Sequence, residues 1–172
     1  MTPEIKTLHL DTVINNHTQD MTNKVVAITG TTSGTGFVCA REMAKLGASV
    51  VLLNRESQRA ASSLEQLNEA VPDGKFDSIA CDLQDFASVR QAIDAIKAKY
   101  DVVNVLCNNA GVMALEDRAT KDGYDVQMQT NAISHFLLTN GLFPLLRKSA
   151  EARIVNHSSM ARLGTPLDSR YF

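Results

Sequence analysis

The sequence predicts an α/β fold, a doubly wound parallel sheet with helices on both faces. From Lys24 onward, short β-branched apolar runs alternate with segments of helical periodicity, and a glycine-rich stretch joins the first run to the first helix. At 172 residues, of which 44% are hydrophobic, the chain can bury the core of one such domain. We therefore expect one domain over residues 23–172, after a loosely ordered leader over residues 1–22.

Five strands are expected because five runs are continuously or almost continuously apolar, as is typical of parallel strands buried on both faces. These runs are Val25–Thr29, Ser49–Leu53, Phe76–Cys81, Val102–Cys107 and Arg153–His157. Right-handed crossovers place them in the order 3-2-1-4-5. A crevice is then expected at the carboxyl ends of the first and fourth strands, where the direction of winding reverses.

The segments between these runs have apolar residues at helical spacing. The first helix is expected over Phe37–Leu46 with a stop at Gly47, and the second carries Leu64, Leu67 and Val71 before Pro72-Asp73-Gly74 ends it. The third carries Val89, Ile93 and Ile96. The longest is expected over Tyr124–Leu146, and its inward-facing candidates are Met128, Ala132, His135, Phe136 and Leu138.

Composition excludes several classes of function. A net charge of -2 and a pI near 6.1, without a basic cluster, argue against nucleic-acid binding. The apolar runs are strand-sized and the first twenty residues lack the apolar core of a signal peptide, so we expect no membrane span and a cytoplasmic protein. Cys39, Cys81 and Cys107 are widely spaced beside apolar elements, which predicts reduced, buried thiols and no metal site.

The stretch Thr29–Gly36 reads Thr-Gly-Thr-Thr-Ser-Gly-Thr-Gly between the first strand and the first helix. Glycines let the backbone approach a phosphate closely, and the helix that follows directs unpaired N–H groups at the anion. The stretch is not a P-loop, because Thr35 follows Gly34 and the Gly-Lys-Ser/Thr sequence is absent. Its glycine spacing also differs from the common dinucleotide-binding pattern. The residues alone therefore predict a phosphate-binding turn, with an ordinary glycine-rich turn as the alternative.

The end of the second strand indicates which nicotinamide cofactor is bound. An acidic residue there accepts a hydrogen bond from the ribose 2′-hydroxyl, whereas a basic residue neutralises a 2′-phosphate. Here Asn54 occupies the acidic position and Arg55 follows it, so we expect NADP(H) with Arg55 on the phosphate. The alternative is that Arg55 is a solvated surface residue.

The spacing Gly-x-x-x-Gly-x-Gly at Gly30, Gly34 and Gly36 resembles that of the short-chain dehydrogenase/reductase family. Asp82-Leu83 and Asn108-Asn109-Ala110-Gly111 are similar to two further segments of the family, an adenine-contacting pair and the Asn-Asn-Ala-Gly signature. Asp122-Gly123-Tyr124 and the segments 135–139 and 153–159 resemble the branch of retinol dehydrogenases, WW-domain-containing oxidoreductases and protochlorophyllide reductases. The predicted cofactor-binding residues are Gly30, Thr32, Ser33, Gly34, Thr35, Gly36, Arg55, Asp82, Leu83, Asn109, Ala110 and Gly111.

The resemblance implies an NADP(H)-dependent oxidoreductase of alcohol or carbonyl substrates on a Rossmann-like three-layer αβα fold. It assigns Asn131 to the support of a proton-relay water and Ser159 to a hydrogen bond with the substrate oxygen, although a helix-bending asparagine and a turn serine are the alternatives. His135 and His157 are expected to be structural. The resemblance also implies that the full-length protein forms a homo-oligomer.

The family's acid/base is a tyrosine in Tyr-x-x-x-Lys, and Tyr171 follows Ser159 by 171 − 159 = 12 positions. Its lysine partner would fall beyond Phe172, and the family's C-terminal strands and helices are absent from these residues. We therefore expect this chain to be an inactive N-terminal portion with an exposed, association-prone last strand. The alternative function is a non-catalytic NADP-binding protein.

Overall fold

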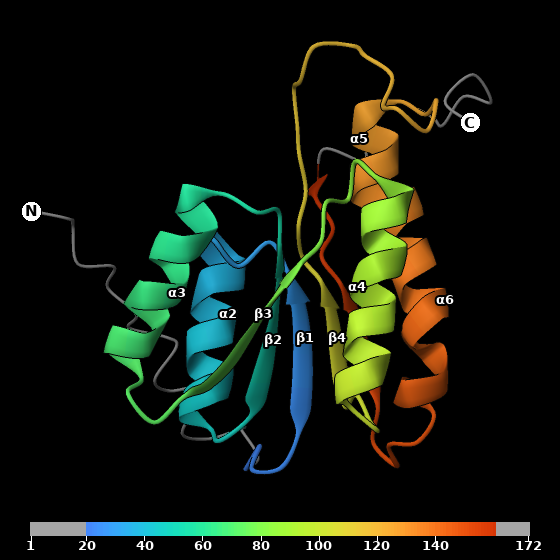
Figure 1. Cartoon of the computed structure of the whole chain (residues 1–172). Coiled ribbons are helices and arrows are strands. Elements are labelled where there is room, and N and C mark those ends of the chain that lie inside the picture. Colours follow the sequence, from blue (N-terminus) through green and yellow to red (C-terminus); the bar gives the residue numbers. More distant parts are fainter. Residues whose placement is uncertain (1–19, 161–172) are drawn as a thin grey trace, which may run out of the picture.

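A computed structural model of the chain describes residues 20–160 and shows a five-stranded parallel sheet with the order β3-β2-β1-β4-β5. The predicted fold class and strand order are confirmed. The strands are β1 (Val25–Thr29), β2 (Ser49–Asn54), β3 (Lys75–Ala80), β4 (Val105–Asn108) and β5 (Arg153–Asn156). Figure 1 shows α2 (Gly34–Lys45) and α3 (Gln58–Ala70) on one face of this sheet, and α4 (Phe86–Lys99) and α6 (Ser134–Leu146) on the other.

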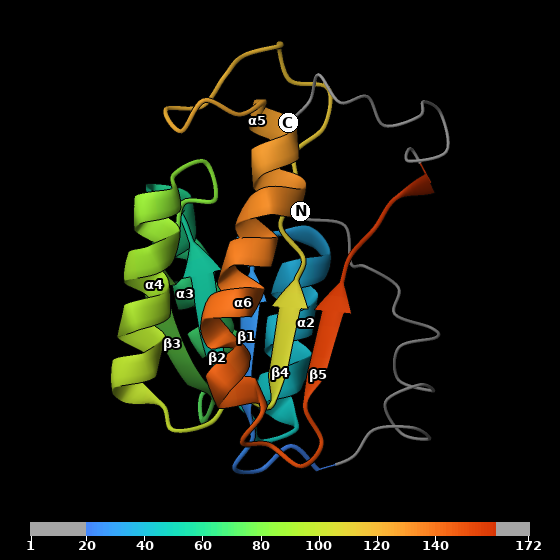
Figure 2. The same cartoon turned by 90° about the vertical axis from the view of Figure 1, so that its right-hand side faces the viewer.

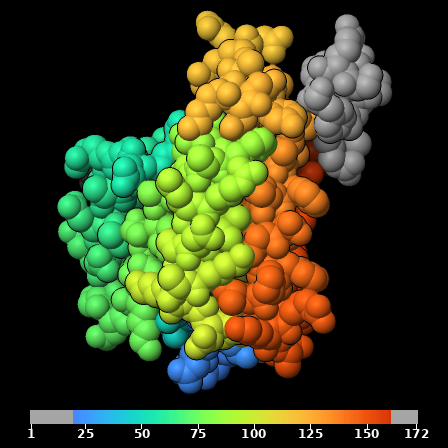
Figure 3. Space-filling view, turned by 45° about the vertical axis from the view of Figure 1, so that its right-hand side comes forward, coloured from blue at the N-terminus to red at the C-terminus, as the bar shows by residue number. Residues whose placement is uncertain are grey.

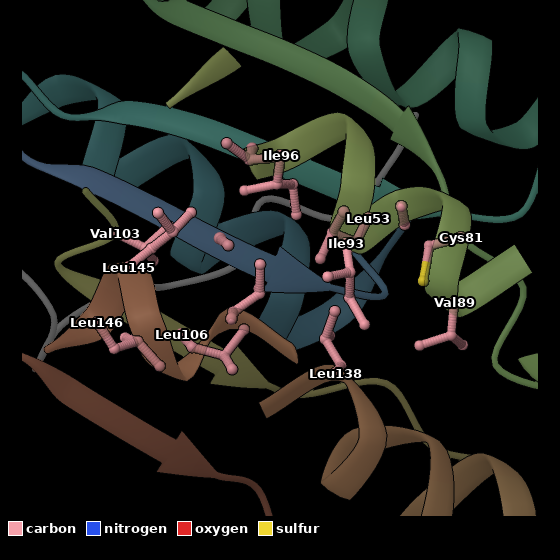
Figure 4. Close-up of a cluster of buried hydrophobic side chains, with 14 of the residues drawn as sticks. Leu53, Cys81, Val89, Ile93, Ile96, Val103, Leu106, Leu138, Leu145 and Leu146 are labelled. Atoms are coloured by element: carbon pink, nitrogen blue, oxygen red, sulfur yellow. The ribbon is translucent and has the colours of Figure 1, made fainter. Parts of the chain in front are cut away.

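Alternate side chains of the central strands enter two separate hydrophobic cores. Val26 and Ile28 of β1 pack with α2 and α3, whereas Ala27 packs with α4 and α6, because successive strand side chains point to opposite faces. The second of these cores is drawn in Figure 4, where Leu106 of β4 lies near Leu138, Leu145 and Leu146 of α6. Burial on both faces explains the continuous apolar runs of β1 and β2, whereas β3 and β5 are more exposed than predicted.

The first helix begins three residues before its predicted start, at Gly34, and the second ends before Pro72 as predicted. Ser57 caps α3 by accepting a hydrogen bond from the Ala60 N–H, and Asp85 caps α4 by accepting from the Ala87 N–H. Gly47 follows α2 with a φ of +92°, which is a conformation that favours glycine. Figure 3 shows α4 and α6 side by side across one face of the molecule.

The fourth strand is shorter than predicted. Pairing with β1 and β5 begins at Val105, not at Val102, because the Val103 N–H donates to Leu145 O at the end of α6. The Asn104 side chain accepts from the Val25 N–H at 2.8 Å and thus takes up a donor at the start of the neighbouring strand. Figure 2 shows β5 beside β4 at one end of the described sheet, and its side chains are exposed.

The predicted long helix is not a uniform α-helix. It begins at Val126, after Asp125 accepts from the N–H groups of Gln127 and Met128, and comprises α5 (Val126–Met128), a π-helical turn η1 (Gln129–Ile133) and α6. The prediction that Ala132 and Phe136 face inward is wrong, since both are exposed, Phe136 to 74%. The π-turn adds a residue to the turn and so rotates the helix away from the 3.6-residue phase. His135 and Leu138 are buried as predicted.

Candidate functional site

A cavity of about 440 Å³ opens at the carboxyl ends of β1, β2, β3 and β4. Its size is within the range of small-molecule and cofactor sites. Of the predicted cofactor-binding residues, those that line it are Gly30, Thr32, Ser33, Thr35, Gly36, Arg55, Asp82, Leu83, Asn109, Ala110 and Gly111. Gly34 does not line the cavity and is instead the first residue of α2.

The glycine-rich loop is packed so closely that side chains would not fit at two of its glycines. A Cβ on Gly36 would lie 2.2 Å from Gly30 O and 2.4 Å from Asn109 Nδ2, and a Cβ on Gly30 would lie 2.9 Å from the Ala110 Cα. Gly34 has open space around it, but its φ of +60° favours glycine. The Ser33 side chain does not cap α2, so the first-turn amides have no side-chain acceptor at the N-cap.

The loop is fastened to the end of β2 by a pair of buried residues. The Thr31 N–H donates to Asn54 Oδ1 at 2.8 Å, and Asn54 Nδ2 donates to Thr31 Oγ1 at 2.7 Å. Asn54 therefore holds the phosphate loop, a role that its position at the end of a strand did not indicate.

Two arginines line the cavity beyond Asn54. Arg55 is exposed there, and Arg59 Nη2 donates to Ser33 Oγ in the glycine-rich loop at 2.6 Å. Sequence reasoning missed Arg59, although a second basic residue four positions after Arg55 was the available signal. The two guanidinium groups give this end of the cavity a positive charge.

The Asp82-Leu83 pair follows β3 and forms the next part of the wall. The Gln84 N–H donates to Asp82 Oδ1 at 2.9 Å, and Leu83 O accepts from Ser134 Oγ at 2.6 Å. Neighbouring Cys81 is buried, and burial together with the nearby Asp82 charge raises the pKa of its thiol to about 12. It remains protonated at neutral pH.

The other two thiols are half-buried, which corrects the expectation that all three cysteines are buried. Cys39 of α2 and Cys107 of β4 form a side-chain hydrogen bond, which lowers the pKa of Cys39 and raises that of Cys107. All three cysteines are free thiols.

Asn109 ties the ends of β1 and β4 together. Its Nδ2 donates to Thr29 O at 2.9 Å and to Gly30 O at 3.1 Å, while Thr29 Oγ1 accepts from the N–H groups of Asn109 and Ala110, both at 2.9 Å. The His157 ring contacts Asn109 Oδ1 through Nδ1 at 3.1 Å. The cavity wall at this point is therefore held by side chains from three strand ends.

One buried polar atom of the wall is an argument for ligand binding. Thr130 lines the cavity and is only 5% exposed, yet within residues 20–160 its Oγ1 is buried without a hydrogen-bond partner. A buried hydroxyl without a partner is costly, and a ligand or water in the cavity would supply one. Together with the glycine cradle, this fits a polar molecule such as a dinucleotide.

Of the three predicted catalytic residues, Asn131 and Ser159 lie in the described part of the chain. Asn131 lies in the π-turn, where its side chain donates to Val112 O and accepts from the Val112 N–H, both at 2.8 Å. Ser159 is exposed after β5, and Tyr171 lies outside residues 20–160. A second hollow between α6 and β5 is lined by Asn131, His135, Phe136, Ile154 and His157, among others.

Within residues 20–160, no group of three His, Cys, Asp or Glu side chains is arranged to hold a metal ion. None of the helices in this same range is long and apolar enough to cross a membrane.

Three relatives match the chain over most of its length. An uncharacterized oxidoreductase of Schizosaccharomyces pombe is 40% identical over 91% of this chain and 48% of its own. A WW domain-containing oxidoreductase of Pongo abelii is 36% identical over 87% and 36%, and human retinol dehydrogenase 13 is 32% identical over 84% and 44%. The chain thus spans about half the length of such relatives or less, and the resemblance to this branch is confirmed.

Solved structures show the same architecture. A short chain dehydrogenase of Shigella flexneri complexed with NADP has a TM-score of 0.67 at 25% identity, over 80% of this chain and 59% of its own. A Pseudomonas aeruginosa RhlG/NADP complex has a TM-score of 0.70 at 28% identity, over 90% and 63%. The sequence profile described as short chain dehydrogenase matches residues 24–171. The chain belongs to the short-chain dehydrogenase/reductase family of oxidoreductases.

Proposed function

We propose that the cavity binds NADP(H) and that the chain is the cofactor-binding portion of an oxidoreductase of alcohol or carbonyl groups. The observation that carries this proposal is the pairing of Arg55 and Arg59 on the wall beside Asn54, where an NAD-binding site would have a carboxylate. A guanidinium forms charge-assisted, bidentate hydrogen bonds with a phosphate. NADP-bound structures among the relatives agree with this choice.

Different residues of the cavity would contact different parts of the cofactor. The backbone of the Gly30–Gly36 loop and the start of α2 would hold the pyrophosphate, and the two arginines the 2′-phosphate. Thr130 Oγ1 and the Asn109–Gly111 wall would contact the remainder. When bound, the cofactor supplies or accepts the hydride.

The protein groups that would handle the substrate proton and oxygen are proposed on the family resemblance. Asn131 would support a water in a proton relay, Ser159 would donate to the substrate oxygen, and Tyr171 is the candidate acid/base. Retinol dehydrogenase 13 is among the relatives, so retinaldehyde is a first carbonyl compound to test. A cytoplasmic location and a homo-oligomer of the full-length protein remain proposals of the same kind.

Calorimetric titration of NADPH and NADH tests the cofactor proposal. Wild type is expected to prefer NADPH, and Arg55→Ala and Arg59→Ala are each expected to weaken NADPH binding by roughly ten- to hundredfold, as loss of a charge-assisted bond predicts, with little effect on NADH. Arg147→Ala, an exposed arginine just after α6, is the control and should leave both affinities unchanged. Equal affinity of wild type for the two cofactors would contradict the proposal.

Turnover separates catalysis from binding alone. Oxidation of NADPH by the full-length protein in the presence of retinaldehyde or a simple aldehyde would support the oxidoreductase. Tight NADPH binding by the full-length protein without turnover of any carbonyl would support the second candidate, a non-catalytic binder. In the described residues that role agrees with the engagement of the Asn131 side chain by Val112 and of its carbonyl by His135.

A further inference from the structure

His135 is a buried histidine to which neither the sequence motifs nor the cofactor proposal gives a role. It is 6% exposed at the start of α6. Its Nδ1 lies 3.1 Å from Asn131 O in the π-turn, and its Nε2 lies 3.0 Å from Thr29 Oγ1 at the end of β1. The His135 imidazole therefore connects the end of β1, beside the larger cavity, with the π-turn η1, which lines the second hollow.

The partners determine which nitrogen carries the hydrogen. A carbonyl oxygen only accepts, so Nδ1 must donate to Asn131 O. In a neutral imidazole Nε2 is then an acceptor, and at 3.0 Å from Thr29 Oγ1 it is a nearer acceptor for the Thr29 hydroxyl than Cys107 O at 3.4 Å, so we assign the hydroxyl hydrogen to it. Thr29 Oγ1 in turn accepts from the Asn109 and Ala110 N–H groups, which uses both of its lone pairs. The Thr29 hydroxyl therefore uses its one hydrogen and both of its lone pairs in hydrogen bonds.

Together with the covalent segment Asn109–Val112, the hydrogen bonds of Thr29, His135 and Asn131 form a closed ring. Thr29 holds its beginning through the two N–H groups, and the Asn131 side chain holds its end through both backbone groups of Val112. His135 joins these two anchors, one through the Thr29 hydroxyl and the other through the Asn131 carbonyl. The segment so enclosed lines the cavity.

We propose that His135 is a positioning residue that closes this ring and thereby fixes the Asn109–Val112 wall against which the cofactor binds. The inference rests on the proposed NADP(H) site for its functional consequence, although the ring itself is independent of any ligand. Because the two arginines lie on a different part of the wall, His135 acts on the part of the cofactor away from the 2′-phosphate.

Amide hydrogen exchange tests the ring without a ligand. In His135→Ala, exchange at Asn109 and Ala110 should accelerate roughly tenfold or more, because the Thr29 hydroxyl that accepts from these two amides has lost the His135 Nε2 acceptor that orients it. Leu142→Ala is the matched control, a buried residue of α6 outside the ring, and it should lower global stability without this local change. Unchanged exchange at both amides in His135→Ala would overturn the proposal.

Should His135→Ala fail to fold, the opposite member of the ring gives a second test. Thr29→Val removes the hydroxyl with little change in volume, and Thr29→Ser retains it. The valine variant should show the fast exchange and the serine variant should restore wild-type protection, whereas equal behaviour of the two would contradict a role for the hydroxyl. In 15N spectra, His135 should show a protonated Nδ1 and an unprotonated Nε2; the reverse tautomer would overturn the ring.

The ligand test compares NADPH with adenosine 2′,5′-bisphosphate, which carries only the arginine-bound end of the cofactor. His135→Ala should bind NADPH roughly tenfold more weakly and the bisphosphate as wild type does. Equal losses for both ligands would show general damage to the cavity and overturn local positioning. If wild type binds neither ligand, the proposed cofactor is refuted. Fast exchange at Asn109 and Ala110 in His135→Ala would still support the hydrogen-bond ring in that case.

Discussion

Asn54 and Thr31 are joined by two buried hydrogen bonds, one from the Thr31 N–H to Asn54 Oδ1 and one from Asn54 Nδ2 to Thr31 Oγ1. The pair connects the end of β2 to the glycine-rich loop after β1. Asn54, whose position at the end of β2 was used to predict the cofactor, thus holds the glycine-rich loop in place.

Asn54→Ala should destabilise the protein by about 1–3 kcal/mol, because it leaves the buried Thr31 N–H without an acceptor. Chemical denaturation measures the change. Asn68→Ala, an exposed asparagine on α3, should have little effect. A similar small effect for both variants would show that water replaces the Asn54 side chain.

Gly36→Ala should abolish dinucleotide binding or prevent folding. Its Cβ would lie 2.2 Å from Gly30 O, and a backbone carbonyl in a tight loop cannot retreat. Gly34→Ala meets open space and should cost only about 1–2 kcal/mol for its positive φ. Thermal melting and NADPH titration of both variants measure the difference, and comparable behaviour would contradict the packing of the loop.

The stability of the protein should fall as the pH is lowered from about 7 to 5.5. Burial lowers the pKa of His135 below its ordinary value of about 6.5, although the hydrogen bond to Asn131 acts in the opposite direction. Below pH 6.5 the unfolded state then binds more protons than the native state, so the stabilising contribution is fully present above pH 6.5 and is lost as the pH falls from there through the lowered pKa of the native state. His135→Gln should show a flatter dependence of the melting temperature on pH; an unchanged slope would contradict the assignment.

The three thiols should differ in their reaction with iodoacetamide at pH 8. Cys81 is 3% exposed with a pKa raised to about 12, so it should react last, near the rate of global unfolding. Cys39 should react first, because it is half-buried and its pKa is lowered by the hydrogen bond with Cys107. Peptide mapping by mass spectrometry at successive times gives the order.

The 172-residue chain should self-associate through β5. Ile154 is 41% and Val155 50% exposed on this strand, which pairs only with β4 among the described elements. Sedimentation velocity should show concentration-dependent association that the variant Ile154→Thr/Val155→Thr reduces, since threonine retains β propensity. A monomer that melts cooperatively at all concentrations would contradict the prediction.

The central strands β1 and β2 were predictable because burial on both faces leaves continuous apolar runs, and the glycine-rich loop because its backbone conformation requires glycine. The direction of Phe136 was not predictable, because the π-turn before it changes the helical phase and has no simple pattern in the sequence. Arg59 was missed for a related reason: only the fold of α3 brings its guanidinium to Ser33.

By itself, the sequence determined the α/β class, the family and the position of the glycine-rich loop, because each depends on local patterns of apolar residues and glycines along the chain. The strand order followed from the right-handed crossovers between parallel strands. The tertiary structure alone decided that Asn54 fastens this loop, that Arg59 joins Arg55, and that His135 connects Thr29 to Asn131. These contacts join residues far apart in the chain, or depend on how a helix end faces a loop. Hydrogen bonds of this kind are set by distance and direction in space, which no spacing in the sequence records.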